Sequence, residues 1–280
     1  MLADTLIRTP RTAGLSVIQP TGAHGARELS GWRAHLAPGE RVSHRLPGHE
    51  MVVVLQEGSG TFRAGGTEGD SASEGFHITD EWTVSRRGVF EERATALYLP
   101  PDVEVTITAT TPLEAILIAT PVAAIARANA VPVLRLPSEV EVLARGRGHY
   151  GRHVHNLFVT DPHARRLMVG ETFNPPGNWS SFPPHKHDGR NGEPELEEVY
   201  HFRVHPPQGF GQQILYTNDG EEVTHVVRDG DVVVLPYGYH PVAAAPGYSL
   251  YYLWAMVGAE RKLALYEDPA HRWIHDIPNA

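Results

Sequence analysis

The segment that decides the fold is His185-Lys186-His187, which is followed by Glu198 and later by Pro236-Tyr237-Gly238-Tyr239-His240. The first two histidines are two residues apart, so on an extended strand both rings project from the same face. Glu198 opens a second apolar run, and His240 follows a strand that ends in a Pro/Gly turn. Three neutral imidazoles and one carboxylate from neighbouring strands can enclose a divalent cation and leave positions open for substrate or water. We therefore expect a metal site made of His185, His187, Glu198 and His240.

A His-x-His pair is weak evidence for a metal site by itself, because the chain has 17 histidines in 280 residues and some pairs will occur by chance. The downstream glutamate and the histidine directly after a Pro-x-Gly turn make the pattern specific. The order His-x-His, Glu, then Gly-(five residues)-Pro-x-Gly-x-His, here Gly230 to His240, resembles the two motifs of the cupin fold.

Composition excludes several classes of function. The net charge is −9 and no basic stripe occurs, so nucleic acid and anionic membranes are poor partners. No apolar run is long enough for a transmembrane helix, and residues 1–8 lack the basic-then-apolar pattern of a signal peptide. The chain has no cysteine, which removes disulfides, thiolate ligands and cysteine nucleophiles. We expect a soluble, cytoplasmic protein.

Short β-branched runs separated by turn residues dominate the chain, for example residues 51–55, 96–99, 103–108 and 115–118. This pattern is typical of a β-sandwich or barrel. Helical patterns are few, and we expect them only at Val122–Ala128 and in a short segment near the C-terminus.

The chain also resembles itself at a distance of about half its length, which indicates duplicated barrels and not a short-period solenoid. Ala96–Glu104 parallels Val233–His240, and His49–Leu55 parallels the strand that opens at Glu198. We expect an all-β fold of two tandem barrels, residues 1–130 and 131–280. The extended, proline-punctuated segment Val131–Pro137 is a natural crossing between them.

The two halves differ where chemistry would lie. No histidine follows Leu99-Pro100, and no His-x-His pair occurs before residue 150. His44, His49 and Glu50 could cluster but lack a fourth ligand, so we expect the first barrel to be structural and without a metal site. His153 and His155 form another His-x-His pair in the second half. They have no glutamate or Pro-Gly-His partner of their own, which favours hydrogen-bonding strand residues.

Longer stretches resemble one family, the 5-deoxy-glucuronate isomerases of bacterial myo-inositol catabolism. The similar segments are Gly177–Asp188, Leu196–Tyr200, Gly238–Val242 and Pro246–Leu253, with Ser85–Glu91 and Ala96–Pro101 in the first half. The run Asn178-Trp179-Ser180-Ser181 is the most specific of them. The chain departs from the family pattern at Phe173–Pro176 and at Trp254, where asparagine is expected.

The resemblance implies a bicupin that converts 5-deoxy-D-glucuronate to 5-dehydro-2-deoxy-D-gluconate, an aldose–ketose isomerisation. One divalent ion (Zn, Mn, Fe or Ni) holding the C1 and C2 oxygens would stabilise an enediol as a Lewis acid, and a nearby base would move the proton. No organic cofactor is needed. The expected partner is a small sugar acid, and edge-strand burial allows a homodimer.

The residues leave the base open among Glu198, Tyr252 and a metal-bound hydroxide. A substrate carboxylate favours an arginine clamp, and the loop of residues 188–195 carries Arg190. Tyr237, just before the last ligand, is the expected pocket wall, whereas Trp179 and Phe182 fit barrel packing. Strand alternation turns Lys186 and Glu197 away from the metal.

Three other functions compete with the isomerase. A related uronate ketol-isomerase of pectin breakdown belongs to the same class of enzyme. A cupin dioxygenase is compatible with the ligand set, since three histidines and one glutamate also suit Fe(II). The third is a non-catalytic, sugar-binding bicupin, which a missing ligand would have favoured.

Overall fold

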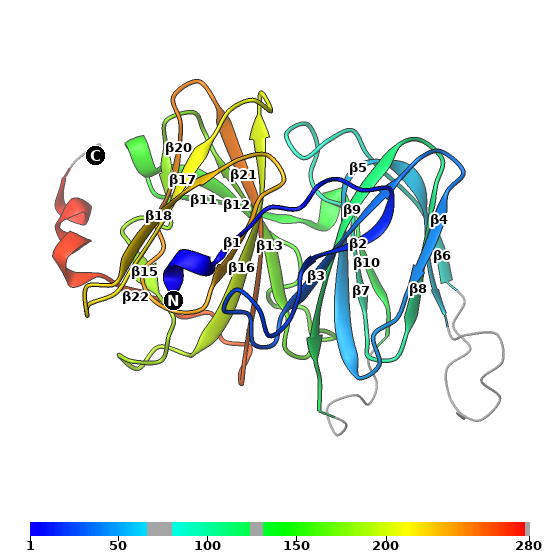
Figure 1. The fold of residues 1–280 in the computed structure, drawn as a ribbon, viewed down its shortest axis with the longest axis horizontal. Coiled ribbons are helices and arrows are strands. Elements are labelled where there is room, and N and C mark those ends of the chain that lie inside the picture. Colours follow the sequence, from blue (N-terminus) through cyan, green and yellow to red (C-terminus); the bar gives the residue numbers. More distant parts are fainter. Residues whose placement is uncertain (66–79, 124–130, 278–280) are drawn as a thin grey trace.

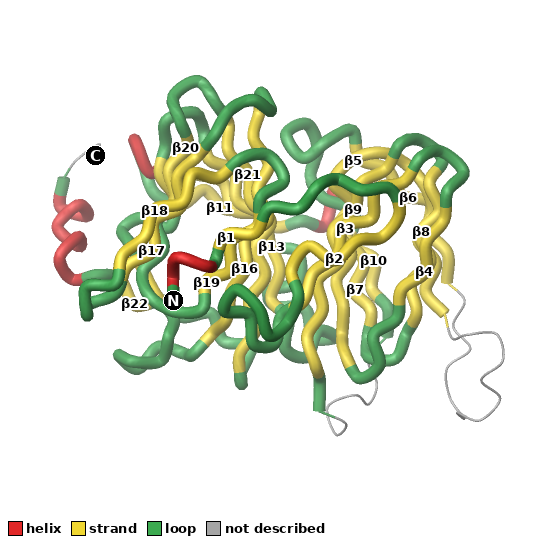
Figure 2. The backbone as a smooth tube through the Cα atoms, in the orientation of Figure 1, coloured by secondary structure: helices red, strands yellow, loops and turns green. Residues whose placement is uncertain are grey.

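A computed structural model describes residues 1–65, 80–123 and 131–277, and its regular structure is almost entirely β (Figures 1 and 2). The elements of the first half are η1 (Leu2–Asp4), β1 (Leu6–Ile7), β2 (Gly14–Gln19), β3 (Ser30–Leu36), β4 (Arg41–His44), β5 (His49–Gly65), β6 (Asp80–Arg86), β7 (Ala96–Leu99), β8 (Glu104–Ala109) and β9 (Leu113–Pro121).

The elements of the second half are β10 (Val133–Arg135), η3 (Pro137–Glu139), β11 (Glu141–Arg145), η4 (Gly148–Tyr150), β12 (Arg152–Asn156), β13 (Met168–Asn174), β14 (Trp179–Ser180), β15 (His185–Lys186), β16 (Leu196–His205), β17 (Gly211–Tyr216), β18 (Glu222–Val227), β19 (Val232–Leu235), β20 (Val242–Ala244), β21 (Ser249–Gly258), β22 (Tyr266–Glu267) and η5 (Pro269–Asp276). The predicted C-terminal helical segment is present as the 3₁₀ helix η5. Most of the predicted helix at 122–128 lies outside the described residues.

The second half forms a barrel from two facing sheets. One has the strand order β1-β19-β16-β21-β13-β12-β11, and the other has the order β14-β20-β17-β18. Side chains from both sheets fill the space between them, among them Tyr200, Phe202, Leu215, Val242 and Tyr252. This arrangement confirms the all-β barrel predicted for this half.

The first half repeats the design. β10-β7-β5-β9-β3-β2 form one face, and the long strand β5 continues into a second face with β6, β8 and β4. β8 shows why a sheet forms here, since Val105, Ile107 and Ala109 alternate inward toward an apolar core. That core also includes Met51, Phe62 and Leu97.

The large sheets of the two barrels pack against each other (Figure 1). Val52, Val54 and Ile118 from the first barrel share a core with Val199, Val234 and Leu253 from the second. The central strands β9 and β19 are therefore covered on both faces, and they are buried along nearly their whole length. This explains why their sequences are continuous apolar runs with no alternation.

Two short strands cross the division predicted near residue 130. β1 lies at the N-terminus but pairs with β19 of the second barrel, with Leu6 opposite Val233. β10 follows the division but pairs with β7 of the first barrel, with Leu134 opposite Leu97. Each barrel thus has one sheet edge covered by a segment from the other half of the chain, so that the edge strand there is only two or three residues long.

Two buried glutamates connect the barrels reciprocally. Glu50 on β5 accepts hydrogen bonds from the backbone N–H groups of residues 165–167 at 2.6–2.7 Å. Glu197 on β16 accepts from the N–H groups of residues 27–29 at 2.8–3.0 Å. Glu197 therefore has the structural environment that strand alternation predicts, and Glu50 is committed to the junction.

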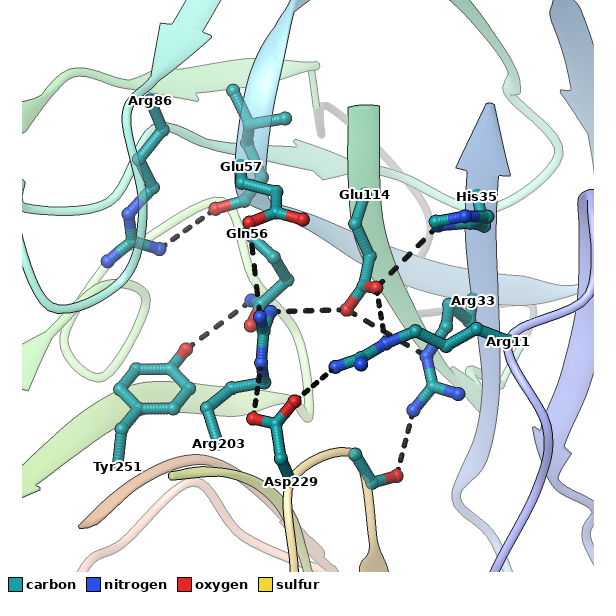
Figure 3. Close-up of polar contacts among 12 residues, drawn as sticks. Arg11, Arg33, His35, Gln56, Glu57, Arg86, Glu114, Arg203, Asp229 and Tyr251 are labelled. Atoms are coloured by element: carbon teal, nitrogen blue, oxygen red, sulfur yellow. Dashed lines mark hydrogen bonds and ion pairs between the residues drawn. The ribbon is translucent and has the colours of Figure 1, made fainter. Parts of the chain in front are cut away.

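A cluster of charged side chains lies where the two barrels meet (Figure 3). The buried carboxylate of Glu114 on β9 lies 2.9 Å from Arg11 and 3.3 Å from Arg203 on β16. Arg86, at the end of β6, is bound by Glu171 on β13 at 2.8 Å, and both side chains are fully buried. The junction is thus an interior with paired charges. Across the described residues, no helix has the length and apolarity needed to cross a membrane.

Candidate metal centre and active site

Three of the four predicted ligands converge inside the second barrel. One ligand atom each from His187, Glu198 and His240 lies within 4.8 Å of the other two, and all three side chains are buried. His187 Nε2 is 3.0 Å from Glu198 Oε2, and His240 Nε2 is 3.4 Å from the same oxygen. They come from the residue after β15, from β16 and from the loop that joins β19 to β20.

His185 lies beside this group without joining it as closely. Its ring centroid is 4.8 Å from that of His240, with the planes nearly perpendicular, and its side chain is buried. β15 pairs with β22, which places His185 opposite Glu267 of the C-terminal segment. The four-ligand set remains a prediction, with three members gathered and the fourth adjacent.

Backbone carbonyls orient two of the imidazoles. His187 Nδ1 is 2.8 Å from the carbonyl oxygen of Leu196, and His240 Nδ1 is 3.0 Å from that of Gly238. A carbonyl oxygen can only accept, so each Nδ1 carries a proton and donates it. In the neutral ring the lone pair is then on Nε2, on the side facing Glu198, which is the arrangement that metal-binding histidines adopt.

The donor set fits a cation, because two buried polar atoms in it have no hydrogen-bond partner within the described residues. These atoms are Glu198 Oε1 and His240 Nε2. A buried acceptor left unpaired costs about 1–3 kcal/mol, and a divalent ion would satisfy both. Imidazole and carboxylate ligands suit zinc and other first-row divalent metals.

Burial dominates the protonation behaviour of the site. It raises the pKa of Glu198, lowers the pKa of His240 to about 3 and holds the pKa of His185 well below its usual value. Burial is the largest influence on the pKa of His187 and acts to lower it, but the hydrogen bond and charge of Glu198 together with the backbone carbonyl of Leu196 outweigh it, so the net pKa is raised. His185 and His240 are therefore neutral near pH 7, as metal ligands must be.

Tyr200 is a site residue that the sequence analysis missed. It lies two positions after Glu198 on β16, so both side chains face the barrel interior. Its hydroxyl interacts with the Glu198 carboxylate, which helps to keep the pKa of the Tyr200 phenol well above its usual value, after burial. The ring centroid is 6.2 Å from that of His240. The two-residue spacing from a predicted ligand was the signal that could have revealed it.

Tyr252, a predicted catalytic residue, is separated from the ligands by Tyr200. Its ring stacks on Tyr200 with centroids 4.2 Å apart, and its hydroxyl donates to Ser180 Oγ at 2.9 Å. Burial raises its pKa, so the phenol is protonated near neutral pH. Ser181 Oγ is 3.2 Å from the Tyr200 hydroxyl. The Asn-Trp-Ser-Ser run therefore supplies two hydroxyls to the same polar cluster.

Arg190 and Tyr237, the predicted substrate-binding residues, face each other, with the guanidinium carbon 5.8 Å from the tyrosine ring centroid. The Arg190 side chain is 56% exposed and lies within 4.0 Å of Asp188 and Asp219. The Tyr237 hydroxyl donates to Glu221 at 2.9 Å. Both side chains thus have acidic partners of their own, and their substrate-binding role remains a prediction.

Lys186 points away from the ligands, as strand alternation predicts. Its ammonium binds the carboxylates of Asp188 and Glu193, and all three side chains are nearly fully buried. Asp188 also accepts from the Gly238 N–H at 3.3 Å. This ion cluster ties the loop after His187 to the turn before His240, and so fixes the separation of two ligands.

The remaining sequence candidates lie elsewhere. Trp179 and Phe182 pack together with centroids 5.8 Å apart. His155 packs against Phe173 with the rings tilted and lies 3.7 Å from Glu171, while His153 is exposed. In the first barrel, the His44 ring packs on Trp32 and His49 Nδ1 lies 2.8 Å from the Pro47 carbonyl oxygen. Within the described residues, none of these histidines joins a converging ligand group.

Comparison with known proteins shows similarity over nearly the whole chain. The protein is 42% identical over 264 residues to the 5-deoxy-glucuronate isomerase of Geobacillus thermodenitrificans (strain NG80-2), covering 92% of this chain and 91% of the relative. It is 36% identical over 245 residues to the 5-deoxy-glucuronate isomerase of Bacillus subtilis (strain 168), covering 85% and 84% of the two chains.

Solved structures agree with the fold. An IolB-like protein from Salmonella typhimurium LT2 superposes with a TM-score of 0.83 at 33% identity, covering 97% of this chain and 99% of that one. Oxalate decarboxylase from Lactobacillus farciminis superposes with a TM-score of 0.66 at 13% identity, covering 99% and 89%, which supports the fold alone. The predicted cupin architecture is confirmed. Residues 8–274 match the KduI/IolB family, and the chain belongs to that family.

Proposed function

We propose that this protein is a metal-dependent aldose–ketose isomerase that converts 5-deoxy-D-glucuronate to 5-dehydro-2-deoxy-D-gluconate in myo-inositol catabolism. One observation carries the proposal: His187, Glu198 and His240 converge in a chain that is 42% identical, over nearly its full length, to a protein named 5-deoxy-glucuronate isomerase. For the uronate ketol-isomerase, the dioxygenase and the sugar-binding protein, the ligand group is not combined with a relative of that name among the proteins compared above.

His185, His187, Glu198 and His240 would hold the cation. A divalent ion bound there would supply Lewis-acid polarisation of the substrate oxygens. The four side chains are buried, so the surrounding protein excludes bulk water and strengthens every charge interaction at the reacting atoms. The sequence does not distinguish Zn, Mn, Fe and Ni, and the imidazole–carboxylate set accepts each of them.

The reaction moves one proton between carbons and one between oxygens. Glu198, through the carboxylate oxygen that the cation leaves free, would take the proton from C2 and return it to C1. The C2 hydroxyl loses its proton while O1 gains one. Ser180 Oγ accepts hydrogen bonds from both Tyr252 and Asn174. The Ser180 hydroxyl would therefore use its own proton in the transfer between the C2 hydroxyl and O1. Tyr252 would position Ser180 for that transfer.

Isomerisation in heavy water tests the proposal. Metal-loaded protein should convert 5-deoxy-D-glucuronate without nicotinamide and without consuming oxygen, and deuterium should appear at the carbon that was the aldehyde. A chelator should abolish turnover, and a divalent metal should restore it. Complete absence of deuterium in the product would contradict proton transfer. Oxygen uptake equal to substrate consumed would establish the dioxygenase alternative, and faster turnover of the uronate from pectin breakdown would establish the other isomerase.

A further inference from the structure

The interior of the second barrel contains an arginine that the proton-transfer scheme does not use. Arg152 is the first residue of β12, and Val154, two positions later, packs against the interior core. Because side chains two apart share a strand face, Arg152 projects into the same interior. β12 pairs with β13, with His153 opposite Phe173. Extending that register by one residue places Arg152 beside Asn174.

Arg152 has no carboxylate partner among the described residues. Its hydrogen bonds come from Nη1 alone and go to the backbone carbonyls of Tyr150 at 3.2 Å and Phe182 at 3.3 Å. Other partly or fully buried arginines are compensated differently. Arg86 is paired with Glu171, and Arg261 donates to five backbone carbonyls through three nitrogens. Arg152 therefore has unused donors and an uncompensated charge.

The surroundings of Arg152 join it to the metal centre. The tyrosines that act on its charge are Tyr252, Tyr200 and Tyr150; Tyr200 lies beside the ligands, and Tyr252 stacks on Tyr200. Its charge also contributes, after burial and the neighbouring histidines, to lowering the pKa of His185. Through the Phe182 carbonyl it contacts the segment that leads into His185. Arg152 and the predicted ligands therefore share the interior of the second barrel.

Asn174 provides an independent observation. Its side chain is 2% exposed, and its Nδ2 donates to Ser180 Oγ at 2.8 Å. Its Oδ1 is buried without a hydrogen-bond partner in the described structure. Leaving a buried acceptor unpaired costs free energy, so a donor is expected there. A substrate hydroxyl group is a donor of the right kind.

We propose that Arg152 and Asn174 form the subsite for the acid end of the substrate, in which Arg152 donates to the carboxylate and Asn174 Oδ1 accepts from a substrate hydroxyl. The inference rests on the proposed function and specifies how that site would select an acid sugar. It assigns the carboxylate clamp to Arg152 in place of Arg190. Arg190 is mostly exposed and already faces Asp188 and Asp219.

A pair of unreactive ligands tests the subsite by binding alone. The first is the hydroxy acid made by reducing the substrate aldehyde, which keeps the carboxylate but cannot isomerise. The second is the carboxamide of that acid, which has the same shape without the charge. Calorimetry on metal-loaded protein should show that the wild type binds the acid more tightly. Arg152→Gln should weaken acid binding by roughly tenfold to a hundredfold and largely remove the preference over the amide.

Arg190→Gln is the matched control and should keep the preference. Arg152→Lys retains a charge and should keep part of the preference, which separates loss of charge from loss of packing. Asn174→Asp should weaken the acid more than the amide, because it places a negative charge in the subsite. If Arg190→Gln loses the preference and Arg152→Gln keeps it, the subsite is overturned while the isomerase proposal stands. A wild type that turns over no 5-deoxy-D-glucuronate would overturn the proposed function, and with it this subsite.

Discussion

The two barrels share strand order and register but differ in the polarity of their interior side chains. Met51 on β5 pairs with Leu99 and Ala119, and Glu198 on β16 pairs with Leu235 and Met256, in equivalent registers. Met51 is thus the structural counterpart of Glu198. By the same register Val53 corresponds to Tyr200. The first interior is an apolar core, and the second contains a carboxylate, imidazoles and phenols.

This contrast shows that topology and chemistry are separable in this chain. Both barrels keep the outward-facing glutamates at equivalent positions, Glu50 and Glu197, because each caps a loop of the other barrel. The inward-facing residues differ in chemistry, with Met51 and Val53 where the second barrel has Glu198 and Tyr200. The large sheet of the second barrel packs against the first barrel. This packing stabilises the second barrel, which can therefore tolerate polar groups in its interior.

Replacing Glu198 with its counterpart from the first barrel should have the largest effect. Glu198→Met removes the only carboxylate of the predicted ligand set, so we expect loss of metal and a fall in kcat/KM of at least about ten-thousandfold, roughly 5.5 kcal/mol of barrier. The metal-free fold should keep its stability, since an apolar residue replaces a buried acid. Metal analysis, kinetics and denaturant titration of the metal-free protein measure the three quantities. Retained activity would refute the ligand assignment.

The reverse exchange should damage stability and create no site. Met51→Glu buries a carboxylate among Leu97, Leu99 and Val105 without a partner, so we expect about 4 kcal/mol of destabilisation. Denaturant unfolding measures this change, and Met51→Leu is the volume-matched control, with an expected change below about 1.5 kcal/mol. A stable Met51→Glu protein that binds a second metal ion would contradict the view of the first barrel as purely structural.

The junction between the barrels should be sensitive to acid. Burial is the largest influence on Glu171 and opposes its ionisation, but the charge of Arg86 and the hydrogen bonds from His155, Arg86 and Tyr251 together outweigh it and hold the pKa of Glu171 below its usual value of 4.5. Stability from this pair is therefore present above pH 4.5 and lost as the pH falls through the lower, folded-state pKa. Glu171→Gln should cost about 3 kcal/mol at pH 7, because Arg86 is left uncompensated, and should flatten the acid side of the stability curve.

Denaturant unfolding between pH 3.5 and pH 7 checks this prediction. Glu195→Gln, which affects the exposed pair with Arg27, should change stability by less than about 1 kcal/mol at any pH in that range. If the free energy of unfolding of wild type and Glu171→Gln depended on pH in the same way, the buried pair would not be responsible for the loss of stability in acid.

Removing one hydroxyl from the active barrel should give the smallest effect. Tyr200→Phe keeps the ring that stacks on Tyr252 and deletes the group that interacts with Glu198. We expect about a tenfold fall in kcat, roughly 1.4 kcal/mol, with metal content unchanged. As a positioning residue, Tyr200 should also shift the pH profile of kcat when its hydroxyl is lost. Tyr216→Phe, whose hydroxyl binds Asp268 at 2.7 Å, is the control, and its profile should match the wild type.

Local patterns in the sequence predicted the barrel class, the half-chain repeat and the convergence of His187, Glu198 and His240. These features follow from periodicity, because a strand puts alternate residues on one face whatever its neighbours are. Strand alternation also places Tyr200, two residues after Glu198, on the same interior face, so the sequence could have identified Tyr200 as a site residue. The first half's lack of a His-x-His, Glu and Pro-x-Gly-x-His series was likewise visible in the residues themselves.

Tertiary structure decided what joins distant segments. The pairing of β1 with β19, the backbone caps at Glu50 and Glu197, and the acidic partners of Arg190 each connect residues far apart in the chain. Sequence spacing holds no information about such contacts, since they depend on how the sheets dock and which groups lose water. Arg152 stands out for the same reason. Its charge is unremarkable in the sequence and becomes informative only because folding places it, half-buried, in the barrel of the predicted ligands with no carboxylate partner among the described residues.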